Sequence, residues 1–219
     1  MSFDWLAPYY RLMESVLAGG KLQRCRLAWL PEARSAKRAL LAGEGHGRFL
    51  AECATQMPQT HFTCLDASRA MLAQAQRAWR EAGGRPEKVS FVHATLPEWS
   101  PPEASFDLIV THFFLDCFPP AELASVIATL TRAARPDAVW LVADFRVPHS
   151  GWVRLRAKLI LASAYVFFKV ATGLPASRLT PPDDLLLRHG FRLLGRRISE
   201  WGLLHADQWR LAEPIAARR

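Results

Sequence analysis

Cysteine is scarce in this sequence, and the few residues present are scattered. Cys25, Cys53, Cys64 and Cys117 form no CxxC pair, and none has a histidine at zinc-binding spacing. A disulfide framework or a structural zinc site would require paired or closely spaced ligands. We therefore expect four free thiols, most of them buried, and no bound metal.

The sequence also lacks a recognisable segment for export or for crossing a membrane. Residues 1–15 mix charges with aromatic side chains, without a basic start, an apolar run and a small-residue cleavage site. The uncharged stretch from Leu159 to Phe168 has ten residues. A bilayer-spanning helix needs ~20 apolar residues. We expect a cytoplasmic protein.

Acidic residues are outnumbered, with 20 Asp and Glu against 28 Lys and Arg, which gives a net charge of +8. Such an excess can favour nucleic acid, an anionic membrane surface or an acidic substrate. The arginines are spread through apparent helices, however, and no strand combines aromatic and basic residues as RNA-binding strands do. We interpret the charge as a solvated basic surface and expect no nucleic-acid partner.

From about residue 37, short apolar runs alternate with longer amphipathic stretches. Strands are expected at 36–42, 61–65, 89–93, 106–113 and 138–145, and helices follow Ser68 and Pro119-Pro120. Two more strands around Gly202 fit an antiparallel hairpin. This order predicts an α/β fold, with a doubly wound, mostly parallel seven-stranded sheet, an antiparallel last strand and helices on both faces. Residues 3–30 and 152–171 are expected to add helices.

Glycines cluster where the first predicted strand turns into a helix. In ALLAGEGHGRFLAE, Gly43, Gly45 and Gly47 occupy positions at which a missing Cβ lets the backbone approach a ligand. Asp66 stands nineteen residues after Gly47, at the end of the second strand. Its carboxylate can accept both hydroxyls of a ribose. Together these residues predict a site for an adenosine-containing ligand.

The glycine spacing also separates two kinds of adenosine ligand. A dinucleotide fingerprint has the form GxGxxG, whereas here the residue after Gly47 is Arg48, whose side chain would crowd the helix–strand packing. An NAD-type oxidoreductase is therefore disfavoured. The observed GxGxG resembles motif I of class I S-adenosylmethionine-dependent methyltransferases. The resemblance covers about residues 36–145, including LDAS after the second strand and FDLIVTHFFLD at the fourth.

The resemblance implies S-adenosyl-L-methionine as methyl donor and S-adenosyl-L-homocysteine as product. It places the methionine part of the donor beside the glycine loop, the ribose on Asp66 and the adenine near the ends of the second and third strands. The family's usual acidic residue two places before the first glycine is Leu41 here, and Glu44 inside the loop is its possible substitute. The cofactor-binding residues implied are Gly43, Glu44, Gly45, Gly47, Asp66, Ala67, Ser68, Met71, Ala94, Thr95, Thr111, His112 and Tyr10.

The acceptor is expected at the carboxyl ends of strands one, four and five, where ligands of open α/β sheets bind. Methyl transfer from a sulfonium is an in-line displacement, so a base is needed only when the acceptor must lose a proton. His112 and Asp116 follow the fourth strand and are the candidate catalytic residues. The alternative for His112 is a hydrogen-bonded wall residue.

The resemblance is to the quinone-biosynthesis type of methyltransferase, which indicates a small, apolar or aromatic acceptor. We interpret the chain as one domain, 1–219. It comprises an N-terminal helical cap (1–35), a cofactor-binding core (36–145), a helical insertion or lid (150–179), and a last helix with the antiparallel hairpin (180–213). The insertion could pack on the sheet, cover the acceptor, form a homodimer in place of a monomer, or contact an anionic membrane peripherally.

Three other functions stay open. A catalytically silent, methyltransferase-like protein could use the same fold as a binding or membrane-surface module. An NAD-type oxidoreductase and an RNA methyltransferase are less favoured. FDLIVTHFFLD contains no N/D-P-P-Y/F loop of the kind that grips an amino group on a nucleobase.

Overall fold

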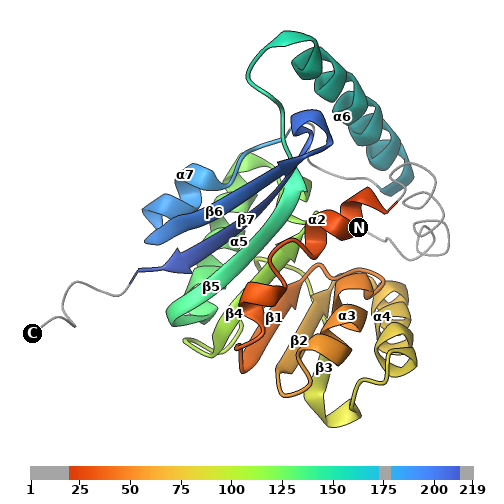
Figure 1. The fold of residues 1–219 in the computed structure, drawn as a ribbon, viewed down its shortest axis with the longest axis vertical. Coiled ribbons are helices and arrows are strands. Elements are labelled where there is room, and N and C mark those ends of the chain that lie inside the picture. Colours follow the sequence, from red (N-terminus) through yellow and green to blue (C-terminus); the bar gives the residue numbers. More distant parts are fainter. Residues whose placement is uncertain (1–19, 173–178, 213–219) are drawn as a thin grey trace, which may run out of the picture.

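A computed structural model of the chain describes residues 20–172 and 179–212. Within these ranges seven strands form one sheet in the order β3-β2-β1-β4-β5-β7-β6 (Figure 1). The first five strands pair in parallel, and β7 runs antiparallel to both β5 and β6. The strands are β1 (Arg38–Ala42), β2 (His61–Asp66), β3 (Val89–His93), β4 (Phe106–His112), β5 (Ala134–Phe145), β6 (Phe191–Ser199) and β7 (Leu204–Leu211). The predicted fold class is confirmed.

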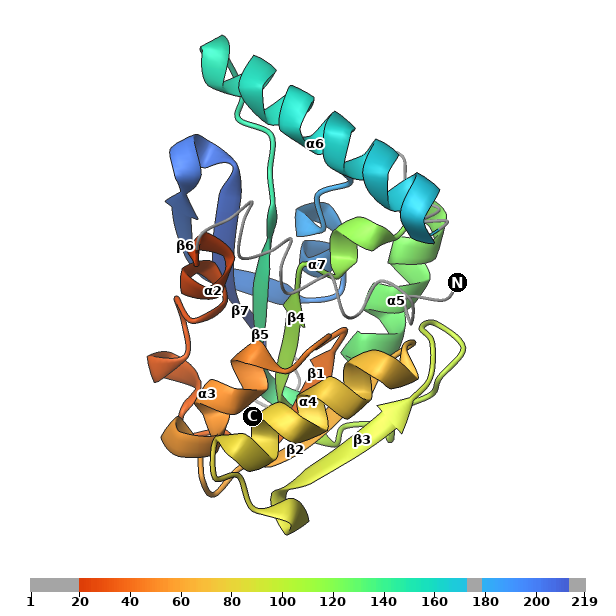
Figure 2. The same ribbon diagram turned by 90° about the vertical axis from the view of Figure 1, so that its right-hand side faces the viewer.

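Helices cover both faces of the sheet (Figures 1 and 2). Phe49, Leu50 and Trp79 pack with Leu41 on one face, and Leu123 of α5 packs with Leu40 on the other. Leu40 and Leu41 are consecutive in the sequence but pack on opposite faces, because successive side chains of a strand point to opposite sides of the sheet. The helices are α2 (Lys21–Arg26), α3 (Arg48–Gln56), α4 (Arg69–Glu81), α5 (Pro120–Ala133), α6 (Gly151–Thr172) and α7 (Asp183–Arg188), with short 3₁₀ turns η1 (Pro31–Ala33), η2 (Pro86–Lys88), η3 (Leu115–Cys117) and η4 (Glu200–Gly202).

The helix boundaries follow the capping residues in the sequence. The Ser68 hydroxyl accepts a hydrogen bond from the Met71 amide and so caps α4. Pro120 occupies the first turn of α5, where a missing N–H has no intrahelical partner to lose. Gly83 follows the end of α4 with a positive φ of 78°. The helix starts expected after Ser68 and at Pro119-Pro120 are confirmed.

The N-terminal helix ends earlier than predicted. The sequence indicated a helix up to residue 30, but α2 ends at Arg26 and residues 27–30 form turns before η1. Pro31 has no N–H to donate to a helical carbonyl, so it cannot continue the helix and instead stands in the first turn of η1. The earlier part of the predicted helix, with Tyr10, lies outside the described residues.

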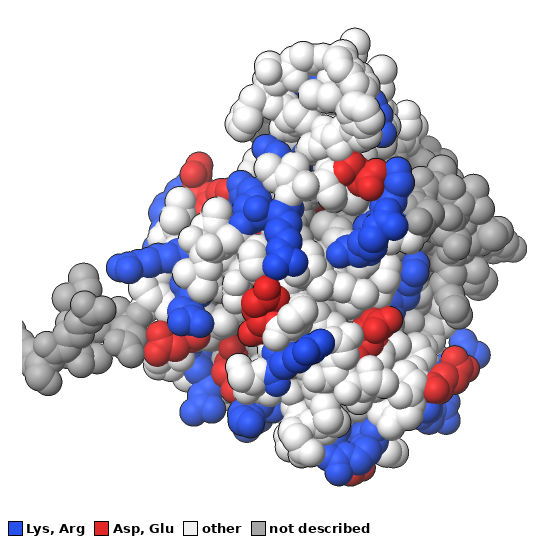
Figure 3. Space-filling model, viewed as in Figure 1, with Lys and Arg blue, Asp and Glu red and all other residues white. Residues whose placement is uncertain are grey.

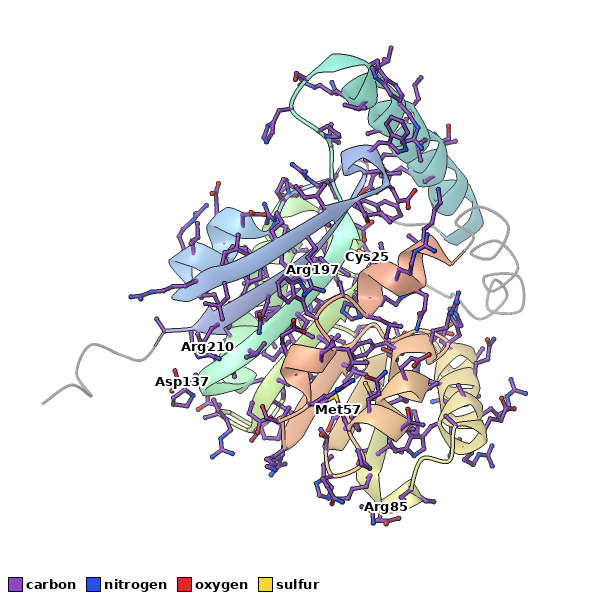
Figure 4. All side chains as sticks on the ribbon, viewed as in Figure 1. Cys25, Met57, Arg85, Asp137, Arg197 and Arg210 are labelled. Carbon is purple, nitrogen blue, oxygen red and sulfur yellow. The ribbon has the colours of Figure 1, made fainter. Side chains whose placement is uncertain are left out.

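The segment after α2 packs against the C-terminal hairpin. The Trp29 indole donates to the Ala206 carbonyl at 2.9 Å, and the Arg197 guanidinium stacks 4.1 Å from the centre of the Trp29 ring. A Cβ on Gly195 would come within 2.5 Å of that ring, so glycine leaves the space that Trp29 fills. Figure 4 shows Arg197 on the hairpin and Cys25 at α2 beside the strands. The Cys25 thiol donates to the His205 carbonyl at 3.2 Å.

Candidate functional site

The glycine loop joins β1 to α3, and each of its glycines meets a different environment. All three have positive φ, between 66° and 85°. A Cβ on Gly47 would come 2.6 Å from the Ala75 Cα in α4, and one on Gly43 would come 2.1 Å from the Phe114 ring. A Cβ on Gly45 would meet nothing within 4 Å. The outer glycines therefore allow close packing, while Gly45 borders open space at the carboxyl end of β1.

Asp66 ties this loop to the end of β2. One carboxylate oxygen accepts the Gly45 amide at 3.0 Å, and the other accepts the Ser68 amide at 2.9 Å. Both bonds fix the orientation of the carboxylate. A carboxylate can accept several donors, and the two hydroxyls of a ribose are donors of the kind it binds. The geometry suits the role predicted for Asp66.

The residues predicted around adenine gather at the ends of β2 and β3. The Ala94 amide donates to the Asp66 carbonyl at 3.3 Å, and His93 Nε2 lies 3.0 Å from the Ala67 carbonyl. Ser68 and Met71 are buried at the start of α4, and the Ser68 hydroxyl serves as the helix cap. Thr95 is exposed. The structure thus brings Ala67, Ser68, Met71, Ala94 and Thr95 together beside Asp66.

Glu44 has a structural role that the sequence did not reveal. One carboxylate oxygen accepts the amides of Phe49 and Leu50, at 3.1 and 3.0 Å, and so caps the amino end of α3. Burial raises the pKa of Glu44 to about 7, although these bonds and Arg26 act in the opposite direction. We therefore assign Glu44 to the support of the loop. Contact with the donor amine is not needed to explain its position.

Thr111 requires a correction. The sequence placed it at the donor site, but its side chain is fully buried and its hydroxyl accepts the Trp140 indole N–H at 2.9 Å. Trp140 belongs to the core on the α5 face of the sheet. The physical reason is strand alternation, which turns consecutive side chains of β4 to opposite faces. The Thr111 side chain therefore lies in the core on the α5 face, where it accepts the hydrogen bond of a buried indole.

His112, the next residue along β4, lies against the donor half of the site. Its ring meets Phe49 of α3 edge-on, with 4.7 Å between ring centres. The side chain is 7% exposed, and Nδ1 has no hydrogen-bond partner among the described residues. Burial and the positive charge of Arg26 lower the pKa of His112 well below its usual value. The imidazole is neutral at physiological pH and can accept a proton through an uncommitted nitrogen.

Asp116 is partly buried in η3 and lies beside a fully buried carboxyl group, Asp144 at the end of β5. One Asp144 oxygen accepts the Asp116 amide at 3.3 Å, and the other accepts the Phe145 amide at 2.7 Å. Burial raises the pKa of Asp116 to about 6. Burial and then the Asp116 charge raise that of Asp144 well above its usual value. The Asp116 charge therefore disfavours ionisation of Asp144.

Electrostatics connects the two halves of the site. The pKa of the Cys117 thiol is raised well above its usual value, first by burial and then by the negative charges of Asp116, Asp144 and Asp66. The acceptor-side carboxyl groups and the predicted ribose ligand therefore lie within electrostatic range of one thiol. A thiol held protonated in this way is a wall residue rather than a nucleophile.

Three residues of the site were missed by the sequence analysis. Asp144 belongs to an apolar run that indicates only a buried strand, although a carboxyl group in such a run was a usable signal. Tyr165 of α6 donates its hydroxyl to the Asp116 carbonyl at 3.3 Å. Arg26 of α2 is buried, with its guanidinium 5.0 Å from the centre of the Phe113 ring. The contacts of Tyr165 and Arg26 join residues far apart in the sequence, so no local sequence pattern predicts them.

The comparisons with known proteins agree with this geometry. Residues 39–137 match a family described as a methyltransferase domain. This segment runs from β1 into β5 and includes the glycine loop, Asp66, His112 and Asp116. This strand order, with a glycine loop at the end of β1, is the Rossmann-like fold of class I S-adenosylmethionine-dependent methyltransferases, and the matched residues 39–137 lie within it.

Solved structures with low sequence identity share the fold. The chain resembles an O-methyltransferase family protein from Burkholderia thailandensis, with 14% identity and a TM-score of 0.68 over 94% of this chain and 60% of that one. It resembles the 1,6-didemethyltoxoflavin-N1-methyltransferase of the same organism, solved with bound S-adenosylhomocysteine, with 19% identity and a TM-score of 0.65 over 96% and 86%. It also resembles the magnesium protoporphyrin IX methyltransferase of Synechocystis PCC 6803, with 17% identity and a TM-score of 0.62 over 88% of this chain and 84% of that one.

The chain thus spans about 60% of the first of these proteins. A search of curated proteins finds no match.

Proposed function

We propose that this protein transfers a methyl group from S-adenosylmethionine to a small, apolar or aromatic acceptor and releases S-adenosylhomocysteine. The observation that carries the proposal is the pairing of Gly45, which borders open space, with the Asp66 carboxylate that its amide holds in place. Both lie at the carboxyl edge of the sheet, where ligands of this fold class bind.

The residues at the donor end fit the proposed cofactor. The backbone at Gly45 can approach the ligand closely, and the Asp66 carboxylate beside it is the kind of group that accepts ribose hydroxyls in this fold class. The chain around Ala67 and Ala94 would border the adenine. When bound, S-adenosylmethionine would supply a methyl group on a positively charged sulfur, and that sulfur is the leaving group when a nucleophilic acceptor atom bonds to the methyl carbon.

The acceptor end combines aromatic side chains with groups that can hold a proton. Phe113 and Phe145 lie at the ends of β4 and β5 with 5.2 Å between ring centres, and both are half-buried. Such rings favour an apolar or aromatic molecule. The neutral His112 imidazole can accept a proton from an O–H or N–H acceptor, and the Asp116–Asp144 pair is the alternative.

The proposal is tested by following release of S-adenosylhomocysteine by the full-length protein with a panel of phenols, quinols, aromatic amines and heterocycles. We expect turnover with at least one aromatic acceptor and its loss in Asp66→Ala. Asp107→Ala is the matched control, because the Asp107 carboxylate also accepts backbone amides, from Lys37 and Arg38 at 3.0 Å, but at the opposite end of the sheet.

Two results would contradict the proposal. Equal turnover in Asp66→Ala and Asp107→Ala would place the donor elsewhere. Tight binding of S-adenosylhomocysteine with no turnover across the panel would favour the silent binding protein instead.

A further inference from the structure

Helix α6 carries an apolar stripe that nothing in the described part of the chain covers. Trp152, Leu155, Leu159 and Val166 are 61%, 62%, 61% and 65% exposed. Their spacing places them on one face of the helix. The opposite face is already occupied, because Leu161 is buried with strand residues of the hairpin side. The stripe therefore faces away from the described part of the fold.

Positive charge borders this stripe, and negative charge is absent from the helix. Lys158 lies to one side of the stripe by helical spacing and Arg156 to the other, and Arg154 is an exposed cation further round the helix. The sequence of α6 contains no Asp or Glu. In Figure 3 the surface over α6, at the top of the molecule, is mostly uncharged, with Lys and Arg at its margin. Apolar residues flanked by cations are typical of a helix that lies in a membrane interface.

A second tryptophan extends the apolar surface beyond the helix. Trp201, in the turn of the hairpin, is 68% exposed and meets the Trp152 ring with 5.4 Å between ring centres. Tryptophan is enriched where a protein contacts the headgroup region of a bilayer. Glu200, the acid beside Trp201, is paired with Lys21 at 2.6 Å. Its charge is thus largely neutralised at this surface.

We propose that α6, with Trp201, docks this protein on the surface of a membrane that contains anionic lipids. The helix would lie parallel to the bilayer, with its stripe among the acyl chains near the headgroups and its cations on lipid phosphates. Among the described residues no helix is long and apolar enough to cross a membrane. Two copies meeting through these stripes would bring their cations together without an acid on either helix, so charge favours an anionic partner over a second copy.

The docked orientation would bring the acceptor end of the site towards the bilayer. Figure 2 shows α6 lying across one end of the sheet, directly after β5. Tyr165, on the same helix, donates its hydroxyl to the Asp116 carbonyl. The docking proposal does not depend on methyl transfer, because it rests on the outward face of α6 and on Trp201.

The experiment is co-sedimentation of the full-length protein with vesicles of phosphatidylcholine alone or of phosphatidylcholine and phosphatidylglycerol in equal parts. We expect binding to the anionic vesicles that falls as salt is raised. The double variant Leu155→Ser/Leu159→Ser should weaken it at least about tenfold, through the loss of buried apolar surface. Arg154→Gln and Lys158→Gln should each weaken it roughly fivefold.

Leu187→Ser is the matched control, because Leu187 is 55% exposed on α7, away from the stripe. We expect this variant to bind vesicles as the unchanged protein does. Circular dichroism melting of every variant excludes misfolding as the cause of a loss. Absence of binding to anionic vesicles at low salt would overturn the proposal. Equal binding by the double variant would do the same, as would a concentration-dependent dimer that the double variant abolishes.

Discussion

The two halves of the candidate site lie at one edge of the sheet but are held together differently. At the ends of β1 and β2, Asp66 is fixed by the amides of Gly45 and Ser68, and the glycine loop packs on α4. At the ends of β4 and β5, buried ionisable groups come from segments far apart in sequence, such as Asp144 of β5 and Arg26 of α2.

The two halves therefore differ in the kind of contact that holds them and in the ionisable groups they contain. The donor half consists mainly of contacts to backbone amides, and its carboxyl group with a raised pKa, Glu44, caps the amino end of α3. The acceptor half holds carboxyl groups with raised pKa values and an imidazole with a lowered one, all through burial. Perturbed ionisable groups concentrate where proton transfer takes place. We infer that the first half positions the cofactor and that the second adapts to the acceptor.

The largest expected effect is on the packing of the glycine loop. Gly47→Ala should lower the free energy of unfolding by about 3 kcal/mol, from a strained positive φ and a clash with the Ala75 backbone. Gly45→Ala meets no atom and should lower it by only about 1 kcal/mol. Urea unfolding of the two variants measures the difference. A Gly47→Ala variant as stable as Gly45→Ala would contradict the packing described for the loop.

Glu44 provides a sharper test of the donor half, because a substitution can remove its charge and keep the hydrogen bonds by which it caps α3. The pKa of Glu44 is raised from an ordinary value of 4.5 to about 7, so its contribution to stability is full below pH 4.5 and is lost as pH rises through about 7. In Glu44→Gln the amide oxygen can still accept the Phe49 and Leu50 amides. We expect this variant to gain on the order of 2 kcal/mol relative to the unchanged protein between pH 5 and 8.

Thermal unfolding at these two pH values measures that gain. A stability difference between Glu44→Gln and the unchanged protein that is the same at pH 5 and pH 8 would show that Glu44 does not titrate in this range.

Removing a carboxyl charge from the acceptor half should also raise stability, but at lower pH and by a smaller amount. Asp116 has its pKa raised from 3.8 to about 6, so its contribution is full below pH 3.8 and declines as pH rises through about 6. Asp116→Asn removes one member of the pair, which should lower the pKa of Asp144. We expect a gain of about 1 kcal/mol at pH 7 relative to pH 4. Asp107→Asn, outside the pair, is the control for removing a strand carboxylate.

Much of the donor half could be predicted from sequence because its contacts are local. The alternation of strands and helices, the Ser68 cap and the hairpin around Gly202 depend on neighbouring residues, and the structure has all of them. The glycine loop and Asp66 lie at the ends of two adjacent strands, β1 and β2. Pattern and spacing are sufficient for features that a single βαβ unit forms.

The remainder could not be predicted because it depends on which side chains the fold brings together. Thr111 and His112 are adjacent in sequence, yet one satisfies the Trp140 indole in the core and the other faces α3. Glu44 could be placed in the loop but not at the end of α3. Arg26 and Tyr165 reach the site from helices whose docking the sequence pattern does not specify.

The central claim is that Gly45 and Asp66 form the binding site for S-adenosylmethionine, and calorimetric titration with S-adenosylhomocysteine tests it most directly. We expect saturable binding by the unchanged protein and a loss of about a hundredfold in affinity in Asp66→Ala, from two charge-assisted hydrogen bonds to the ribose. The affinity of Asp107→Ala should change by less than about threefold. Binding that Asp66→Ala and Asp107→Ala weaken equally, or no binding by the unchanged protein, would contradict the assignment of this site.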